Sequence, residues 1–251
     1  MDPRAELYFA LSECYKEPAE AFARDVAGGV LYQVMADGFQ ALGIPEDTSI
    51  LRQVLRQAQE GPQDTAGLST SLELLYIAGS PETVLQTLKR AYYPLFVIPP
   101  HFVLPVESVF KEWAGEDGFL TGSRDMIMGP PATDMLRRYQ AQGIVIPQSF
   151  KDYPDHLALL LEYGGLLCEE EGKWKEERGK GKEEVKMEEG FHPPSSILHL
   201  PSFVAAHLDT WIEEFAEQVC SRSETPFYRT VVSATVAFVQ AERQHLEAIL
   251  P

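Results

Sequence analysis

The sequence is poor in cysteine. Its 251 residues include three cysteines, Cys14, Cys168 and Cys220, which stand far apart along the chain. Disulfide-rich domains and two-cysteine zinc knuckles need more cysteines or a closer spacing. The composition therefore excludes a disulfide framework and predicts three buried thiols in a reducing compartment.

Basic side chains are also scarce. The chain has 21 lysines and arginines against 38 aspartates and glutamates, which gives a formal net charge of -17. Such a charge repels the phosphates of DNA, RNA and anionic membranes, and it attracts cationic peptides. We therefore expect no nucleic-acid partner, and a cationic peptide is favoured.

Long apolar runs are missing as well. No stretch approaches the roughly 20 apolar residues that cross a bilayer. Residues 1–6 lack the basic start and the apolar segment of a secretory signal. These features predict no stable membrane insertion and a cytoplasmic location.

The motifs of common enzyme classes do not occur. The sequence has no Gly-Lys-Ser/Thr phosphate loop and no Gly-x-Ser-x-Gly nucleophile elbow. Its six histidines never stand four residues apart, which is the spacing that holds zinc on one helix. The sequence thus predicts no catalysis, no metal and no cofactor.

Helical periodicity dominates what remains, and alternating strand patterns are almost absent. Leu7, Leu11 and Cys14 share one helical face, and Ser80-Pro81-Glu82 is typical of a capped helix start, here of a helix to about Tyr92. A later stripe has the same three- and four-residue spacing: Val204, Leu208, Trp211, Phe215 and Val219. The pattern predicts an all-α bundle.

Prolines and glycines divide this bundle. Four prolines in residues 93–105 predict an extended, largely buried connection. Breaks at 129–131 and 143–147 bracket a short helix over 133–142, with Gly143 suited to a left-handed cap. We expect one domain over 1–251, with an N-terminal half (about 1–122), a hinge (about 123–150) and a C-terminal half (about 151–251).

A strong apolar helix starts at Tyr153-Pro154-Asp155-His156 and runs into a highly charged segment at 169–190. That segment is interpreted as a solvated helix extension or a mobile loop. Asp155 and His156 point about 100° apart on a helix, so they do not form a base and its orienting partner by themselves. Asp155 can complement the helix dipole, His156 can be a packing residue, and Glu107 and Ser108 can cap a helix start. Ligand binding by these four residues is the alternative.

Two motifs favour ligand binding over a purely structural role for these residues. The first is Tyr92-x-x-Leu95-Phe96, followed by Pro99-Pro100 and Pro105-x-Glu107-Ser108-Val109-Phe110, and the second is Tyr153-Pro154-Asp155-His156-Leu157. In their order and spacing they resemble the TorD/DmsD/NarJ family of redox-enzyme maturation chaperones. The resemblance extends over roughly residues 3–248.

The resemblance implies a single helical fold of roughly 10–12 helices in two halves joined by a hinge. It also implies that the protein binds the twin-arginine signal peptide, the folded body, or both, of the catalytic subunit of a molybdenum- or tungsten-containing oxidoreductase. Export is then held back until the cofactor is inserted. By position, the resemblance assigns ten residues to the peptide groove: Tyr92, Leu95, Phe96, Pro105, Glu107, Ser108, Phe110, Tyr153, Asp155 and His156.

Some features depart from the family. Tyr92 and Val106 stand where some relatives carry tryptophan, and the charged run at 173–189 has no evident counterpart. Two other functions remain open: a helical adaptor unrelated to redox enzymes, and a small helical enzyme or nucleotide-binding protein that uses Glu107, Asp155 and His156. A monomer and a domain-swapped dimer are both compatible with the hinge.

Overall fold

The computed structural model describes residues 2–44, 72–100, 102–111, 127–180 and 200–249. Within these ranges the regular elements are α-helices, short 3-10 helices and a π-helical turn at 204–208. The β-type pairing found there is one isolated antiparallel bridge, between Val106 and His156. The all-α prediction is confirmed.

The first part of the chain forms small helices and one longer helix. These are α1 (Pro3–Cys14), α2 (Glu20–Ala27), α3 (Val30–Ala41), η1 (Leu72–Leu75) and α5 (Pro81–Phe96). Asp2 caps α1 by accepting a hydrogen bond from the Arg4 amide at 2.9 Å. Ser80 caps α5 through the Thr83 amide at 3.3 Å, with Pro81 in the first turn, as the sequence predicted.

Helix α5 ends later than the sequence predicted. It continues to Phe96 and includes Pro94, because a proline near the end of a helix costs few hydrogen bonds. The residues after it, Val97 and Ile98, are 47% and 52% exposed, whereas Val103 is buried. Pro99 and Pro100 are exposed as well. The expectation of an extended, largely buried connection was therefore wrong for residues 93–100 and correct nearer to Val103.

The second part contains the longest helices. Its elements are α6 (Glu107–Phe110), α7 (Pro130–Ala141), η2 (Gln148–Phe150), α8 (Leu157–Lys180), the π-helical η3 (Val204–Leu208), α10 (Ile212–Arg222) and α11 (Pro226–Ile249). Helix α7 starts three residues before the predicted 133–142, and Gly143 follows it in the predicted left-handed conformation with φ 68°.

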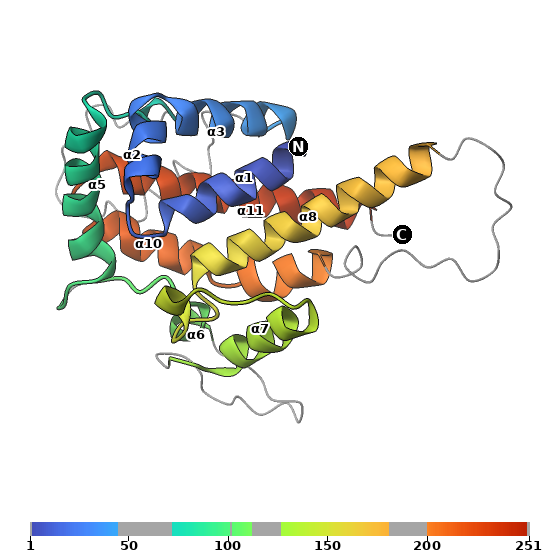
Figure 1. The fold of residues 1–251 in the computed structure, drawn as a ribbon. Coiled ribbons are helices and arrows are strands. Elements are labelled where there is room, and N and C mark those ends of the chain that lie inside the picture. The colour runs from blue at the N-terminus through green and yellow to red at the C-terminus, as the bar shows by residue number, and fades with distance from the viewer. Residues whose placement is uncertain (1, 45–71, 101, 112–126, 181–199, 250–251) are drawn as a thin grey trace, which may run out of the picture.

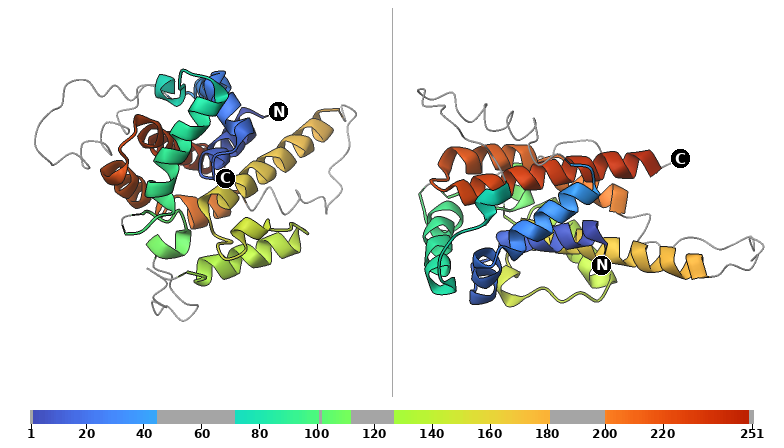
Figure 2. Two further views of the ribbon diagram at one scale, coloured as in Figure 1. Left: turned by 60° about the vertical axis from the view of Figure 1, so that its left-hand side comes forward. Right: turned by 90° about the horizontal axis from the view of Figure 1, so that it is seen from above.

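The charged segment is helical as far as the structure describes it, and residues 181–190 lie outside the described part. Figures 1 and 2 show the end of α8 projecting beyond the other helices. Glu171, however, is only 4% exposed and makes an ion pair with Arg4 at 3.3 Å. Arg4 also pairs with buried Glu242 of α11 at 2.6 Å, so this segment is not solvated throughout.

Helix α1 lies at the centre of the bundle, packed against α3, α8 and α11 (Figures 1 and 2). Tyr8 and Leu11 of α1 are fully buried. A Cβ atom at Gly164 of α8 would lie 2.5 Å from a ring carbon of Tyr8, so glycine allows the two helices to approach closely. Helix α5 crosses one end of the bundle and packs against α2.

Candidate functional site

The two sequence motifs meet in space. The Leu157 amide donates to the Pro105 carbonyl at 2.8 Å, and the Glu107 amide donates to the Asp155 carbonyl at 3.1 Å. The antiparallel bridge between Val106 and His156 lies between these two hydrogen bonds. Segment 105–110 is therefore joined by its backbone to the start of α8. We call this contact between 105–110 and 155–157 the motif junction.

Asp155 is directed into the motif junction. Its Oδ2 accepts hydrogen bonds from the Ser108 amide at 2.8 Å and from the Ser108 hydroxyl at 2.5 Å. Its Oδ1 is buried and has no hydrogen-bond partner among the residues that the structure describes. Burial raises the pKa of Asp155, and the two bonds from Ser108 oppose that rise. The carboxylate thus holds the first turn of α6 and is fully buried.

Helix α8 starts at Leu157 and not at Tyr153–His156 as the sequence predicted, so Asp155 and His156 precede it. His156 has a capping role in this position. Its Nδ1 accepts a hydrogen bond from the Ala158 amide at 3.1 Å, in the first turn of α8. The ring is 6% exposed and lies edge-on to Phe150 at 4.8 Å between centroids. Burial lowers the pKa of His156 to about 3, so the ring is neutral and able to accept at physiological pH.

Glu107 begins a chain of polar contacts across three elements. Its Oε2 lies 2.7 Å from Nδ1 of His207 in η3, and its Oε1 accepts from Lys111 at 3.3 Å. The other ring nitrogen of His207 lies 2.9 Å from Oδ2 of Asp134 in α7. Burial raises the pKa of Glu107, and the contact with His207 opposes it. This network connects α6, α7 and η3.

The aromatic residues of the first motif belong to the core. Phe96 packs against Tyr228 at 5.2 Å and Phe110 stacks on Trp211 at 5.5 Å. Both also contact Phe215 of α10, at 6.4 Å and 5.7 Å. Segments far apart in sequence thus share one aromatic cluster.

Nine of the ten residues that the sequence assigned to the groove are buried, and Tyr153 is partly exposed. They are Tyr92, Leu95 and Phe96 of α5, Pro105, Glu107, Ser108 and Phe110 around α6, and Asp155 and His156 before α8. The structure therefore brings the two motifs together and turns most of their side chains inward. Peptide contact by these residues remains a prediction.

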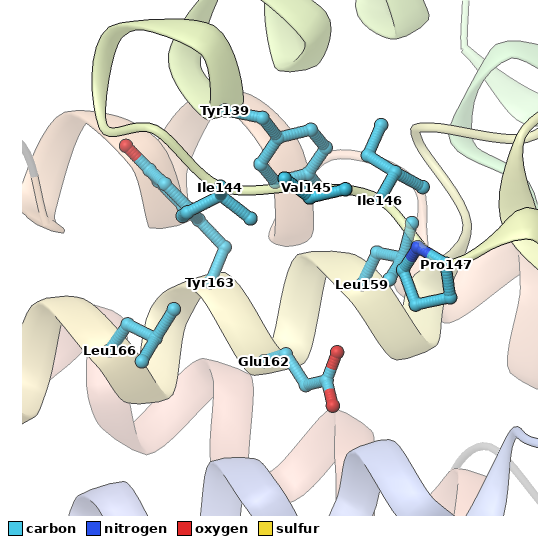
Figure 3. Close-up of a pocket in the computed structure, with 9 residues that line it drawn as sticks. All are labelled: Tyr139, Ile144, Val145, Ile146, Pro147, Leu159, Glu162, Tyr163 and Leu166. Carbon is cyan, nitrogen blue, oxygen red and sulfur yellow. The ribbon is translucent and has the colours of Figure 1, made fainter.

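A surface pocket lies between α8 and segment 144–147 (Figure 3). It has a volume of about 140 Å³. Its lining residues are Tyr139, Ile144, Val145, Ile146, Pro147, Leu159, Glu162, Tyr163 and Leu166. The sequence predicted only a chain break at 143–147, although three consecutive β-branched residues next to Gly143 are an unusual loop composition.

The comparison with protein families matches residues 56–217 to the nitrate reductase delta subunit family. That range is well over half of the chain and contains both motifs. The chain belongs to this family. The resemblance to TorD/DmsD/NarJ proteins, on which the sequence analysis relied, is thereby confirmed.

Proteins named chaperone protein TorD are similar to this chain. The one from Vibrio vulnificus strain YJ016 is 25% identical over 146 residues, which cover 58% of this chain and 57% of the relative. The one from Vibrio cholerae El Tor Inaba N16961 is 22% identical over 126 residues, covering 50% and 51%. The chain thus spans little more than half the length of these relatives.

A relative from Psychrobacter sp. PRwf-1, also named chaperone protein TorD, is 24% identical over 241 residues and covers 95% of this chain and 92% of its own length. The search of solved structures gave no significant match. Within the described part of the chain, no group of three or more His, Cys, Asp and Glu side chains could hold a metal ion. No helix in that part is long and apolar enough to cross a membrane.

Proposed function

We propose that this protein is a maturation chaperone for a molybdenum- or tungsten-containing oxidoreductase. The observation that carries the proposal is the family match over 56–217, which includes both motifs, together with relatives named chaperone protein TorD. The chaperone binds the catalytic subunit through its signal peptide, its folded body, or both. It assists cofactor insertion and assembly in the cytoplasm, before export.

The charge of the chain supports this partner. A twin-arginine signal peptide is cationic at its start and apolar in its middle, and a chain with a net charge of -17 attracts it. A hydrogen bond between an arginine and a carboxylate contributes about 1.5–3 kcal/mol where it is partly buried. Binding is reversible and involves no turnover.

The ten motif residues remain candidates for peptide contact. Because six of them, at 105–110 and 155–156, are buried at the motif junction, direct contact by these six requires segment 102–111 to move away from the start of α8. Four hydrogen bonds resist that movement: two backbone bonds across the motif junction and two from Ser108 to Asp155. We propose that the residues at 105–110 and 153–156 fix the motif junction and contact the peptide when the junction opens.

The test is isothermal titration with two ligands: the signal peptide of a molybdoenzyme encoded next to this chain, and the same enzyme subunit without that peptide. A control peptide has both arginines changed to alanine. Micromolar or tighter binding of either ligand supports the chaperone function, and its loss in the control assigns recognition to the arginines. Binding of neither ligand contradicts the proposal and favours an unrelated helical adaptor.

A further inference from the structure

The pocket under segment 144–147 is built from one face of α8 and an extended loop. Leu159, Glu162, Tyr163 and Leu166 stand three and four residues apart, so they share a face of the helix. Figure 3 shows segment 144–147 passing over this face, with Tyr139 of α7 beside it. Gln142 donates to the Tyr163 hydroxyl at 3.0 Å and fixes one end of the loop to α8.

The size and lining of the pocket restrict what it can hold. Most sites for small-molecule ligands occupy about 300–1,000 Å³, and this pocket has about 140 Å³. An apolar cavity of about 150 Å³ accommodates a molecule the size of benzene. The pocket thus fits one leucine or phenylalanine side chain, as from a docked polypeptide, and is too small for a nucleotide or a pterin cofactor.

The loop that covers the pocket is itself exposed. Val145 is 89% exposed, the highest value among the large apolar side chains of the described residues. The backbone groups of Val145 and Ile146 make no hydrogen bond with any other residue that the structure describes. An extended segment with unpaired backbone groups is able to pair with an extended peptide, while a neighbouring pocket takes a side chain.

The charge near the pocket selects the kind of peptide. Glu162 lines the pocket, its side chain is 36% exposed, and its Oε1 accepts from Lys16 at 2.5 Å. Farther along α8, Glu169 and Glu170 come about two turns later, roughly 11 Å along the helix. Lys16 is itself shared with Glu13 at 2.6 Å. Arg138, which lies beside Tyr163, is paired with Asp134 at 2.7 Å, so both of these cations near the pocket already have carboxylate partners.

We propose that this pocket is a docking site for a basic segment of the partner polypeptide, in which one leucine or phenylalanine enters the pocket and a neighbouring arginine binds the carboxylate of Glu162. The inference rests on the proposed function, since the apolar segment after the twin arginines of a signal peptide has this chemistry. The site differs from the motif junction, so the two are tested separately.

The first test is fluorescence polarisation of the labelled signal peptide with the full-length chain and its Val145→Arg variant. Because Val145 is 89% exposed, the variant keeps the fold, which thermal unfolding followed by circular dichroism checks. The added charge repels the peptide and its long side chain covers the pocket. We expect binding about tenfold weaker or more, equivalent to about 1.4 kcal/mol.

The matched control is Val30→Arg, which places the same charge on another exposed valine, 50% exposed at the start of α3. We expect a change of less than about twofold there, because the charge lies outside the pocket and is screened by salt. Changing the anchoring leucine or phenylalanine of the peptide to alanine weakens binding to the wild-type chain. It causes little further loss in Val145→Arg, because the pocket is already blocked.

The carboxylate is tested by Glu162→Gln against peptides with and without the neighbouring arginine. We expect a loss of about three- to tenfold only for the peptide that carries the arginine, since the site is partly exposed to solvent. The control is Glu20→Gln on α2, which is exposed and makes the same change of net charge. Equal losses for both peptides contradict a direct contact with Glu162.

The outcomes separate this inference from the proposed function. If the wild-type chain binds the peptide and Val145→Arg binds it equally well, the pocket inference is wrong and the chaperone function stands. If the wild-type chain binds only the enzyme body, the same variants are titrated with the body, and unchanged affinity again overturns the inference. If neither ligand binds and sedimentation shows that Val145→Arg disrupts a dimer, the pocket serves a second copy of the chain and both proposals fail.

Discussion

Replacement of Asp155 by alanine measures what the buried carboxylate contributes to the motif junction. The variant loses the acceptor of two hydrogen bonds from Ser108, at 2.8 Å and 2.5 Å, and leaves both donors in a buried site. Hydrogen bonds to a charged group contribute about 1.5–3 kcal/mol each. Since both end on one oxygen, we use the lower value and expect a loss of about 3 kcal/mol in the free energy of unfolding.

That loss is a large part of the total stability, which for a domain is about 5–15 kcal/mol. For a chain of this length it lowers the melting temperature by roughly 6–12 °C. Urea unfolding followed by far-UV circular dichroism measures it. The control is Asp152→Ala, an exposed aspartate three residues earlier, for which we expect a change within about 0.5 kcal/mol.

Asp155→Asn separates the charge from the hydrogen bonds. It keeps an acceptor for Ser108 and removes a carboxylate whose pKa is raised by burial. A carboxyl group whose pKa is raised in the folded state stabilises the fold at a pH below its unfolded pKa, which is about 3.9. This stabilisation is lost as the pH rises through the folded-state pKa. We therefore expect the stability of Asp155→Asn relative to the wild type to increase with pH above about 4 and then level off.

Two results would refute this reasoning: Asp155→Ala as stable as the wild type, or Asp155→Asn as unstable as Asp155→Ala. The same pair of variants also tests the sequence-based site. If Asp155→Asn is as stable as the wild type but binds the signal peptide more weakly, the carboxylate takes part in peptide recognition. If it keeps full affinity, the role of Asp155 is to hold α6.

Two further predictions concern packing and a buried charge. Gly164→Ala is expected to destabilise the protein by about 1–3 kcal/mol, because its Cβ would lie 2.5 Å from a ring carbon of Tyr8. A Cβ at Gly172 in the same helix meets no described residue within 4 Å, so Gly172→Ala is expected to stabilise the protein by up to about 1 kcal/mol. Equal effects of the two variants in thermal unfolding would contradict the close contact. His207→Leu is expected to cost about 3–5 kcal/mol, because Glu107 loses a partner at 2.7 Å in a fully buried site. The double variant His207→Leu/Glu107→Leu should recover part of this loss in urea unfolding, and no recovery would show that the two side chains are not coupled.

Helical periodicity was sufficient to predict much of the fold. The spacing of Val204, Leu208 and Trp211 marks a buried face, and all three are at most 1% exposed. The single helix that this stripe predicted was wrong, because a turn at 209–211 divides it into η3 and α10. The start of α5 at Pro81 and the left-handed Gly143 were also predicted, since caps and turns depend on a few neighbouring residues. The end of α5 was misplaced because tertiary contacts of Phe96 hold a last turn that includes Pro94.

The candidate sites depended on contacts that the sequence does not encode locally. Asp155 and Ser108 are 47 residues apart, and Glu107 and His207 are 100 apart, so no local pattern predicts that they meet. The sequence identified Asp155 and Glu107 as notable carboxylates, but it gave no information about their burial. Asp134 carried no signal of its own, and it joins the network only because α7 lies beside η3.

The sequence by itself determined the helical class, the negative charge and the family, because composition, periodicity and motif order are properties of the chain. Tertiary structure decided that most motif side chains face inward and that 144–147 covers an apolar pocket on α8. The physical reason is that a helix pattern specifies an apolar face, while the packing of distant helices determines which element covers that face and which part of it remains open.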